Sequence, residues 1–259
     1  MTSGPLARTV ADAAALLDAM AVEFPGDPFH APASERGFLA AARGPIPRLR
    51  IGVVTEPIIA DVELDPEAAV AVHKTAAWLE ALGHEVVPTS RPFGPDLVAQ
   101  FEAVWHTLAL LTPVMPDDED RLQPLTRHLR GLGREVSGIQ LAMAVSLLRI
   151  QTRATLAAWS GFDAVVMPTV NGVAPLVDDI VDRVDPARDF ENQKRWAAFT
   201  AAFNMTGQPA VSAPLHWTSQ GLPVGVMLLG KMFAEETLIG LAAQLEQAHP
   251  WSDRKPEAW

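Results

Sequence analysis

The 259-residue sequence contains no cysteine. Disulfide bonds, a thiolate nucleophile and cysteine-ligated zinc are therefore all excluded. No apolar run reaches the roughly 18 residues needed to cross a bilayer, and the opening stretch MTSGPLARTV lacks the apolar segment of a secretory signal. We therefore expect a cytoplasmic protein with no membrane partner.

Basic residues are also scarce. The chain has 20 lysines and arginines against 31 aspartates and glutamates, which gives a net charge of −11 at pH 7. Such a charge repels the phosphates of nucleic acids, so we expect no nucleic-acid partner. Hydrophobic residues make up 49% of the chain, enough for a sizeable core. Because no linker, repeat or low-complexity tract interrupts the pattern, we expect a single domain over residues 1–259.

The clearest structural signal is a strand–helix–strand pattern. Residues 49–56 (LRIGVVTE) and 84–90 (HEVVPTS) are rich in β-branched residues. Residues 64–83 predict a helix with Asp65 as N-cap, proline at its first position and Gly83 after its end. A helical crossover between two strands implies parallel pairing, which predicts an α/β fold with helices covering the sheet.

Other segments predict further helices and strands by the same criteria. We expect helices over residues 8–21, 137–161, 189–207 and 234–250, and strands over residues 162–170 and on both sides of a Ser-Gln-Gly turn within residues 209–231.

Short motifs that would identify a function by themselves are absent. The sequence has no phosphate-binding loop, no dinucleotide fingerprint, no HExxH and no GxSxG. Its histidines never fall at metal-ligand spacing, so we expect surface or capping roles for them. The acidic stretch PDDED could bind a hard cation, but it lacks the glycine and spaced ligands of a calcium loop. We expect a solvated acidic loop there, with no metal and no cofactor.

Hydroxyl groups offer few candidates for chemistry. Thr169, Val170 and Asn171 follow a buried strand, where ligands of open α/β sheets sit. A threonine that merely caps the loop is an equally good interpretation of that position. Ser212 and Ser3 lack an evident activating base, so we interpret them as a strand hydroxyl and a turn residue.

Four stretches together resemble the amidase signature family, in the same order and at roughly the same spacing. They are TSGPLARTVADAAALLDAM, FDAVVMPT, FNMTGQPAVSAPLHWTSQGLPVGVMLLGK and ETLIGLAAQLEQAHPW. The resemblance covers nearly the whole chain. It implies one mixed β-sheet covered by helices on both faces, that is, part of the family's α/β/α sandwich. It also implies hydrolysis of amides or esters without a cofactor.

The family's catalytic groups have no match in this sequence. The family uses a lysine, a serine in a cis peptide and a nucleophilic serine, with the latter two in a Gly/Ser-rich segment. No such segment occurs here, and no lysine of the chain lies in the matching context. We therefore assign no catalytic residue. The resemblance carries over only three substrate-binding positions: Thr169, Val170 and Trp105, the last on the helix that borders the family's substrate cleft.

Three functional hypotheses follow. In the first, the chain is the C-terminal half of a split or truncated amidase that acts on a small-molecule amide, is inactive alone and needs an N-terminal half or self-association. In the second, it is a non-catalytic remnant that binds a partner or a small molecule. In the third, it is a hydrolase with new catalytic residues, a hypothesis that no motif of the sequence supports. On the first hypothesis we expect an exposed sheet edge and exposed apolar helix faces.

Overall fold

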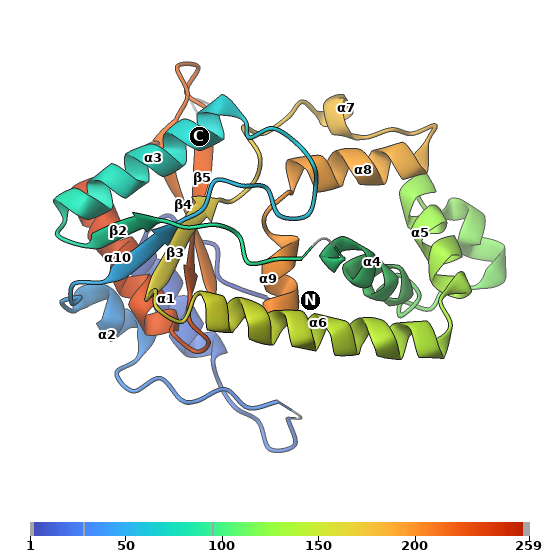
Figure 1. Cartoon of the computed structure of the whole chain (residues 1–259), viewed down its shortest axis with the longest axis horizontal. Helices are drawn as coiled ribbons and strands as arrows, with labels where there is room; N and C mark the ends of the chain where they lie inside the picture. Colours follow the sequence, from blue (N-terminus) through green and yellow to red (C-terminus); the bar gives the residue numbers. More distant parts are fainter. Residues whose placement is uncertain (1–2, 28, 95, 256–259) are drawn as a thin grey trace.

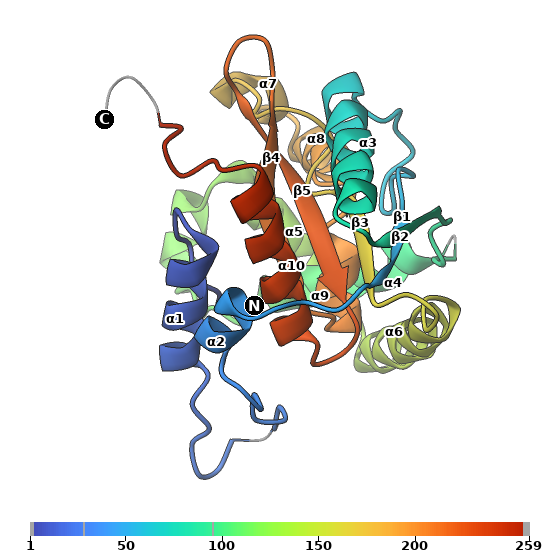
Figure 2. The same ribbon diagram turned by 90° about the vertical axis from the view of Figure 1, so that its left-hand side faces the viewer.

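The computed structural model describes residues 3–27, 29–94 and 96–255, and its centre is a β-sheet between layers of helices (Figures 1 and 2). The sheet has five strands in the order β2-β1-β3-β5-β4. Strands β1, β2 and β3 pair in parallel, whereas β5 runs antiparallel to both β3 and β4. The strands are β1 (Arg50–Val53), β2 (Glu85–Pro88), β3 (Ala164–Pro168), β4 (Ala210–Trp217) and β5 (Pro223–Gly230). The predicted mixed sheet is confirmed.

The strand–helix–strand prediction is confirmed in detail. Helix α3 (Pro66–Ala81) connects β1 to β2, and the Asp65 side chain caps it by accepting a hydrogen bond from the backbone N–H of Glu67 at 2.8 Å. Gly83 follows the helix with a φ of +94°, a conformation that glycine adopts without a steric cost. The local sequence thus dictates both where this helix begins and where it ends.

The remaining helices cover both faces of the sheet. They are α1 (Val10–Met20), α2 (Phe38–Arg43), α4 (Leu97–Leu108), α5 (Pro124–Glu135), α6 (Gly138–Ala158), α7 (Val177–Ile180), α8 (Pro186–Trp196), α9 (Ala201–Thr206) and α10 (Glu235–Ala248), with a 3₁₀ helix, η1, at Pro116–Arg121. Helix α6 begins where the helix over residues 137–161 was predicted, and Ser137 and Gln140 form a capping box at its start. None of the helices within the described ranges is long and apolar enough to cross a membrane.

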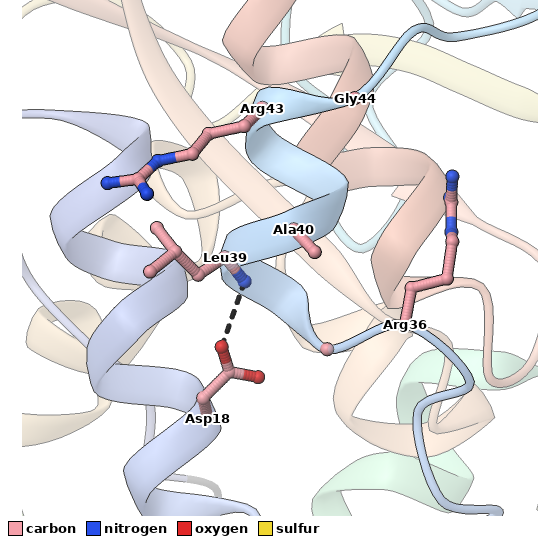
Figure 3. Close-up of a pocket in the computed structure, with 7 residues that line it drawn as sticks. Asp18, Arg36, Leu39, Ala40, Arg43 and Gly44 are labelled. Carbon is pink, nitrogen blue, oxygen red and sulfur yellow. Dashed lines mark hydrogen bonds between the residues drawn. The ribbon is translucent and has the colours of Figure 1, made fainter.

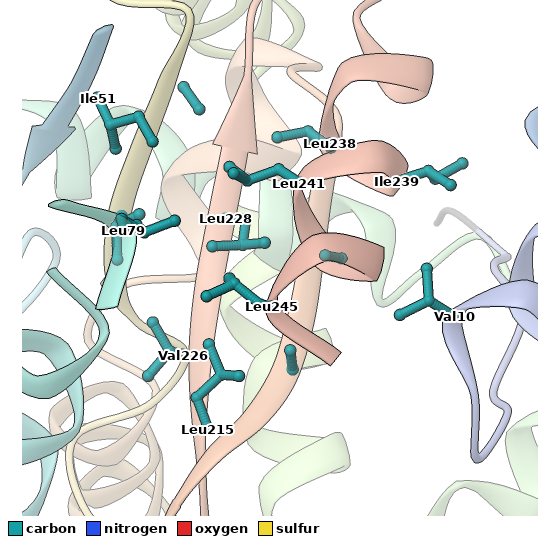
Figure 4. Close-up of a cluster of buried hydrophobic side chains, with 14 of the residues drawn as sticks. Val10, Ile51, Leu79, Leu215, Val226, Leu228, Leu238, Ile239, Leu241 and Leu245 are labelled. Atoms are coloured by element: carbon teal, nitrogen blue, oxygen red, sulfur yellow. The ribbon is translucent and has the colours of Figure 1, made fainter. Parts of the chain in front are cut away.

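One face of the sheet packs against α3 and α10, and α1 and α2 pack against α10 (Figure 2). Figure 4 shows Val226 and Leu228 of β5 facing Leu241 and Leu245 of α10. All four side chains are essentially inaccessible to solvent. Burying such a side chain stabilises the fold by about 1.5–3 kcal/mol, so this layer anchors α10 to the sheet.

The opposite face packs against α4, α6 and α9. Met227 and Leu229 of β5 point to this side, since side chains alternate along a strand. Aromatic rings fill the layer: Trp159 lies edge-on to Phe93, with ring centroids 5.9 Å apart, and stacks near Phe203 at 6.4 Å. Strand β5 is therefore covered on both sides.

The prediction of a single helix over residues 189–207 is wrong, because the structure has two helices in this region, α8 and α9. The break falls at residues 197–200. The carbonyl oxygen of Ala198 accepts hydrogen bonds from the backbone N–H groups of Ile58 and Ile59, at 2.9 and 3.0 Å. That carbonyl ties the loop after β1 to the break. The helical periodicity of the sequence does not predict a long-range contact of this kind.

Asp18 of α1 holds the start of α2. Its carboxylate accepts hydrogen bonds from the backbone N–H groups of Phe38 and Leu39, at 2.7 and 2.9 Å (Figure 3). The first N–H groups of a helix have no partner within the helix, and a carboxylate there also meets the positive end of the helix dipole. Gly37, the N-cap residue, has no side chain that could do this.

We expect the substitution Asp18→Ala to lower the free energy of unfolding by about 1 kcal/mol, because two helix N–H groups lose their acceptor. Urea denaturation measures this. Asp61→Ala removes an exposed carboxylate that makes no hydrogen bond or ion pair within the described ranges, and it should leave the urea midpoint unchanged. Equal effects of the two substitutions would contradict the assigned role of Asp18.

Candidate functional site

Two hydroxyl groups meet where β3 ends. Thr169 directly follows β3, and its Oγ1 lies 2.6 Å from Oγ of Ser212 on β4. The backbone N–H of Thr169 donates to the carbonyl of Gly225 on β5 at 3.1 Å, which fixes the residue beside the sheet. We call Thr169 and Ser212 the hydroxyl pair. Ser212 is exposed and Thr169 is half-buried, so the pair is accessible from solvent.

Gly225 provides the space in which the hydroxyl pair forms. A Cβ atom at this position would lie 2.9 Å from both Ser212 Oγ and Thr169 Oγ1. Gly225 of β5 pairs with Pro214 of β4, and two residues along the strands Met227 pairs with Ser212. Side chains alternate along a strand, so these positions share one face of the sheet, the face covered by α4, α6 and α9. A side chain here would push the two hydroxyls apart.

The hydroxyl pair has unused hydrogen-bonding capacity. One hydroxyl donates its proton to the other, and the acceptor then keeps its own proton for a further partner. Free lone pairs remain on both oxygens. The pair can therefore donate to a carbonyl oxygen and accept from an N–H, which are the two polar groups of an amide.

Asn171, the third residue after β3, has a structural role. Its Oδ1 accepts from the backbone N–H of Asp65 at 2.9 Å, and its Nδ2 donates to the carbonyl of Glu63 at 3.0 Å. Its own backbone N–H donates to the carbonyl of Trp196 at 2.8 Å. Asn171 thus joins the loop after β3 to the start of α3 and the end of α8, and has little capacity left for a ligand.

Two of the three predicted substrate-binding residues are adjacent in the loop after β3, and the third lies on α4. Val170 is half-buried beside Thr169. Trp105 lies on α4, is 42% exposed and stacks on Phe101 with ring centroids 5.4 Å apart. Within residues 3–27, 29–94 and 96–255, no hydrogen bond or ring contact joins Trp105 to Thr169 or Val170. That all three bind substrate stays a prediction.

Helix α8 connects the two parts of the candidate site. Lys194 of α8 bonds to Glu102 of α4 and to Glu191 of its own helix, each at 2.5 Å. At the C-terminal end of α8, the carbonyl of Trp196 accepts a hydrogen bond from the backbone N–H of Asn171. The helix that carries Trp105 and the loop that carries Thr169 are therefore held by the same element.

Lys194 is a buried lysine of the described residues, but its protonation state does not suit a general base. Burial disfavours its ammonium group, yet the hydrogen bonds to Glu102 and Glu191 outweigh burial and raise the pKa of Lys194. The side chain therefore stays protonated at neutral pH and cannot take a proton from a nucleophile.

The acidic stretch PDDED forms most of η1, and its carboxylates bind arginines. Glu119 accepts from Arg130 at 2.9 Å and from Arg134 at 2.7 Å. These hydrogen bonds lower the pKa of Glu119 to about 2. Within the described ranges, no group of three histidine, aspartate or glutamate side chains could hold a metal ion. The prediction was a solvated acidic loop, whereas Glu119 pairs with the buried Arg130.

Two histidines depart from the predicted surface or capping roles. His84 is buried and accepts from the backbone N–H of Leu49 at 3.0 Å. His216 is also buried, and its Nε2 lies 2.7 Å from a carboxylate oxygen of Glu67. Both contacts join residues distant in sequence, so the prediction was wrong for a reason that sequence spacing could not reveal.

The comparisons with known proteins agree with this architecture. The amidase family matches residues 1–239. The chain belongs to the amidase family. The 6-aminohexanoate-cyclic-dimer hydrolase of Pseudomonas sp. (strain NK87) is 32% identical over 272 residues, which cover 98% of this chain and 55% of that enzyme. The putative amidase AmiB2 of Mycobacterium bovis is 34% identical over 277 residues and covers 98% of this chain and 53% of that protein.

Solved structures of amidase-family proteins have the same fold. A 6-aminohexanoate cyclic dimer hydrolase superposes with a TM-score of 0.84 at 30% identity, over 97% of this chain and 55% of that one. A bacterial aryl acylamidase superposes with a TM-score of 0.78 at 19% identity, over 97% of this chain and 54% of that one, which shows the fold alone. The chain thus spans about half the length of the amidase-family relatives that it matches.

Sequence reasoning missed two residues of the candidate site, Ser212 and Gly225. Ser212 was interpreted as a strand hydroxyl without further role, and Gly225 was passed over. The turn between β4 and β5 predicts which strands pair, but an irregularity between Pro214 and His216 shifts the register. That shift decides which residue lies opposite Gly225.

We expect Gly225→Ala to lower the free energy of unfolding by about 1–3 kcal/mol, because the added methyl group overlaps both hydroxyls. Thermal or urea unfolding measures this. Gly131→Ala is the matched control: no atom lies within 4 Å of a Cβ there, and alanine favours a helix interior. It should be neutral or stabilising, and a loss equal to that of Gly225→Ala would contradict the steric argument.

The lowered pKa of Glu119 predicts an effect of pH on stability. A carboxylate with a lowered folded-state pKa stabilises the fold above its unfolded pKa of 4.5, and this contribution disappears as pH falls towards about 2. We expect Glu119→Gln to reduce the urea midpoint at pH 7 and to differ progressively less from the unsubstituted protein below pH 4.5. Asp120→Asn, whose carboxylate is 96% exposed, should change the midpoint little at any pH.

Proposed function

We propose that this chain forms the substrate-binding part of an amide hydrolase and that turnover requires a second polypeptide segment carrying the catalytic serines and lysine. The observation that carries the proposal is the exposed hydroxyl pair over Gly225, in a chain of the amidase family whose sequence has no Gly/Ser-rich catalytic segment. The length of the relatives, about twice that of the matched region, also supports it.

The hydroxyl pair would bind the amide group or a polar group close to it. Thr169 and Ser212 lie on the face of the sheet covered by α4, α6 and α9, at the carboxyl end of β3, where α/β sheets bind ligands. Val170 continues the same loop. Trp105, exposed on α4, would contribute an apolar surface from the helix that α8 joins to this loop.

Two exposed surfaces support a requirement for a partner. In the sheet of the described residues, β4 pairs only with β5, so its other edge is open along eight residues. Helix α6 exposes Ile139, Met143 and Ile150, at 76%, 59% and 64%. These positions recur at helical spacing, so they form one apolar stripe. We propose that the catalytic segment covers such surfaces, with self-association as the alternative outcome.

The first substrate to test is the 6-aminohexanoate cyclic dimer, because two relatives above 30% identity are hydrolases of that compound. An aryl amide and a simple aliphatic amide are the comparison substrates. The functional class under test is hydrolysis of a carbon–nitrogen bond in a small molecule.

We expect the purified chain to release no amine from these amides, whereas co-expression with a polypeptide bearing the Gly/Ser-rich catalytic segment of the family yields turnover. The N-terminal part of the Pseudomonas relative would supply that polypeptide. Turnover by the chain alone would contradict the proposal. A stable complex without turnover would favour the non-catalytic remnant.

In the active complex, Thr169→Val and Ser212→Ala test the hydroxyl pair. Each removes one hydrogen bond worth about 0.5–1.5 kcal/mol, so KM should rise roughly three- to tenfold with kcat little changed. Ser160→Ala is the matched control, since Ser160 is exposed beyond the end of α6 and its hydroxyl donates to the carbonyl of Ala157. Unchanged KM in both pair variants would contradict the assignment.

A further inference from the structure

A second concave site lies on the other face of the sheet. It is a groove of about 340 Å³ between α3, the end of β4 and the segment after α10. Lys74, Trp78, Leu215, Trp217, His249 and Arg254 line it. We call it the basic groove, because its three ionisable lining residues are a lysine, a histidine and an arginine. The sheet separates it from the hydroxyl pair, since Leu215 belongs to the core layer of α3 and α10.

Aromatic rings form the walls of the basic groove. Trp78 and His249 stack with ring centroids 3.5 Å apart and planes inclined by 15°. The ammonium nitrogen of Lys74 lies 4.7 Å from the centroid of Trp78, and the guanidinium carbon of Arg254 lies 4.2 Å from that of Trp217. Each cation thus rests on an indole ring, which attracts it through the negative potential of the ring face.

In the described part of the chain, these two cations have no carboxylate partner. Within residues 3–27, 29–94 and 96–255, neither Lys74 nor Arg254 takes part in an ion pair with a carboxylate. Two carboxylates of the neighbouring elements are engaged elsewhere: Glu67 of α3 binds His216 at 2.7 Å, and Glu246 of α10 accepts from the backbone N–H of Val10 at 3.0 Å. Glu80 of α3 and Asp253, beside Arg254, do not line the groove. Burial and the charge of Lys74 lower the pKa of His249. In a chain of net charge −11, this is a locally positive surface.

The lining residues indicate the chemistry of a ligand. Ammonium and guanidinium groups have N–H donors that a ring face cannot saturate, and carboxylates are their preferred acceptors. Two indole rings and a leucine side chain offer an apolar surface beside those donors. We propose that the basic groove binds a small aromatic carboxylate, with its carboxylate at Lys74 and Arg254 and its ring against the tryptophans.

Benzoate is the probe, and calorimetric titration of the purified chain measures binding. We expect saturable binding of benzoate at millimolar concentrations. Acetate, which lacks the ring, and benzyl alcohol, which lacks the charge, should each bind at least about tenfold more weakly, since losing either set of contacts costs about one decade of affinity. Inorganic phosphate tests whether any anion suffices. Absence of saturable benzoate binding, or phosphate binding as tight as that of benzoate, would overturn the proposal.

Substitutions in the basic groove test whether benzoate binds there. Lys74→Met and Arg254→Met should each weaken benzoate about tenfold, whereas Lys74→Arg and Arg254→Lys keep the charge and should retain most of the affinity. Arg153→Met is the matched control, because Arg153 is an exposed arginine of α6, lies outside the groove, and forms no ion pair with any described residue. Thermal unfolding of each variant checks that the fold is intact. Equal affinity in Lys74→Met, Arg254→Met and Arg153→Met would place benzoate elsewhere and overturn the proposal.

Discussion

Strand β5 is the element on which the rest of the structure depends. It pairs antiparallel with β3 on one side and with β4 on the other, so it joins the parallel part of the sheet to the C-terminal hairpin. Its side chains enter both core layers: Val226 and Leu228 face α10, and Met227 and Leu229 face the aromatic layer. The same strand contributes Gly225, where it passes Thr169 and Ser212. Core packing and the candidate site therefore share one register, and a shift of that register by one residue would exchange the two faces.

The fold follows from the sequence wherever the determining contacts are local. The Asp65 cap, the Ser137 capping box and the Ser-Gln-Gly turn are each readable within a few residues, and each lies where the structure has it. The break between α8 and α9 could not be read in this way, because Ala198 is held by backbone groups of Ile58 and Ile59, about 140 residues earlier. The burial of His84 and His216 has the same origin in long-range partners.

The candidate site was only partly predictable. Position after a buried strand indicated Thr169, and the family resemblance indicated Val170 and Trp105. Ser212 needed the pairing register of β4 and β5, which the irregularity between Pro214 and His216 alters. The basic groove could not be foreseen at all, because α3, β4 and the segment after α10 contribute its residues separately. Sequence patterns give the elements, whereas a site assembled from several elements depends on how they pack.

Energetics favour a binding role for the hydroxyl pair over a purely structural one. A hydrogen bond between two accessible hydroxyls contributes about 0.5–1.5 kcal/mol, and a glycine inside a strand costs roughly 0.5–1 kcal/mol relative to alanine. The two contributions nearly cancel, so an arrangement that requires Gly225 to bring Thr169 and Ser212 to 2.6 Å brings the fold little net stability. A site that must hold two oriented hydroxyls ready for a ligand gains from the same arrangement, because the orientation is fixed before binding. This energy balance supports the proposal that the hydroxyl pair is a binding site at the end of β3.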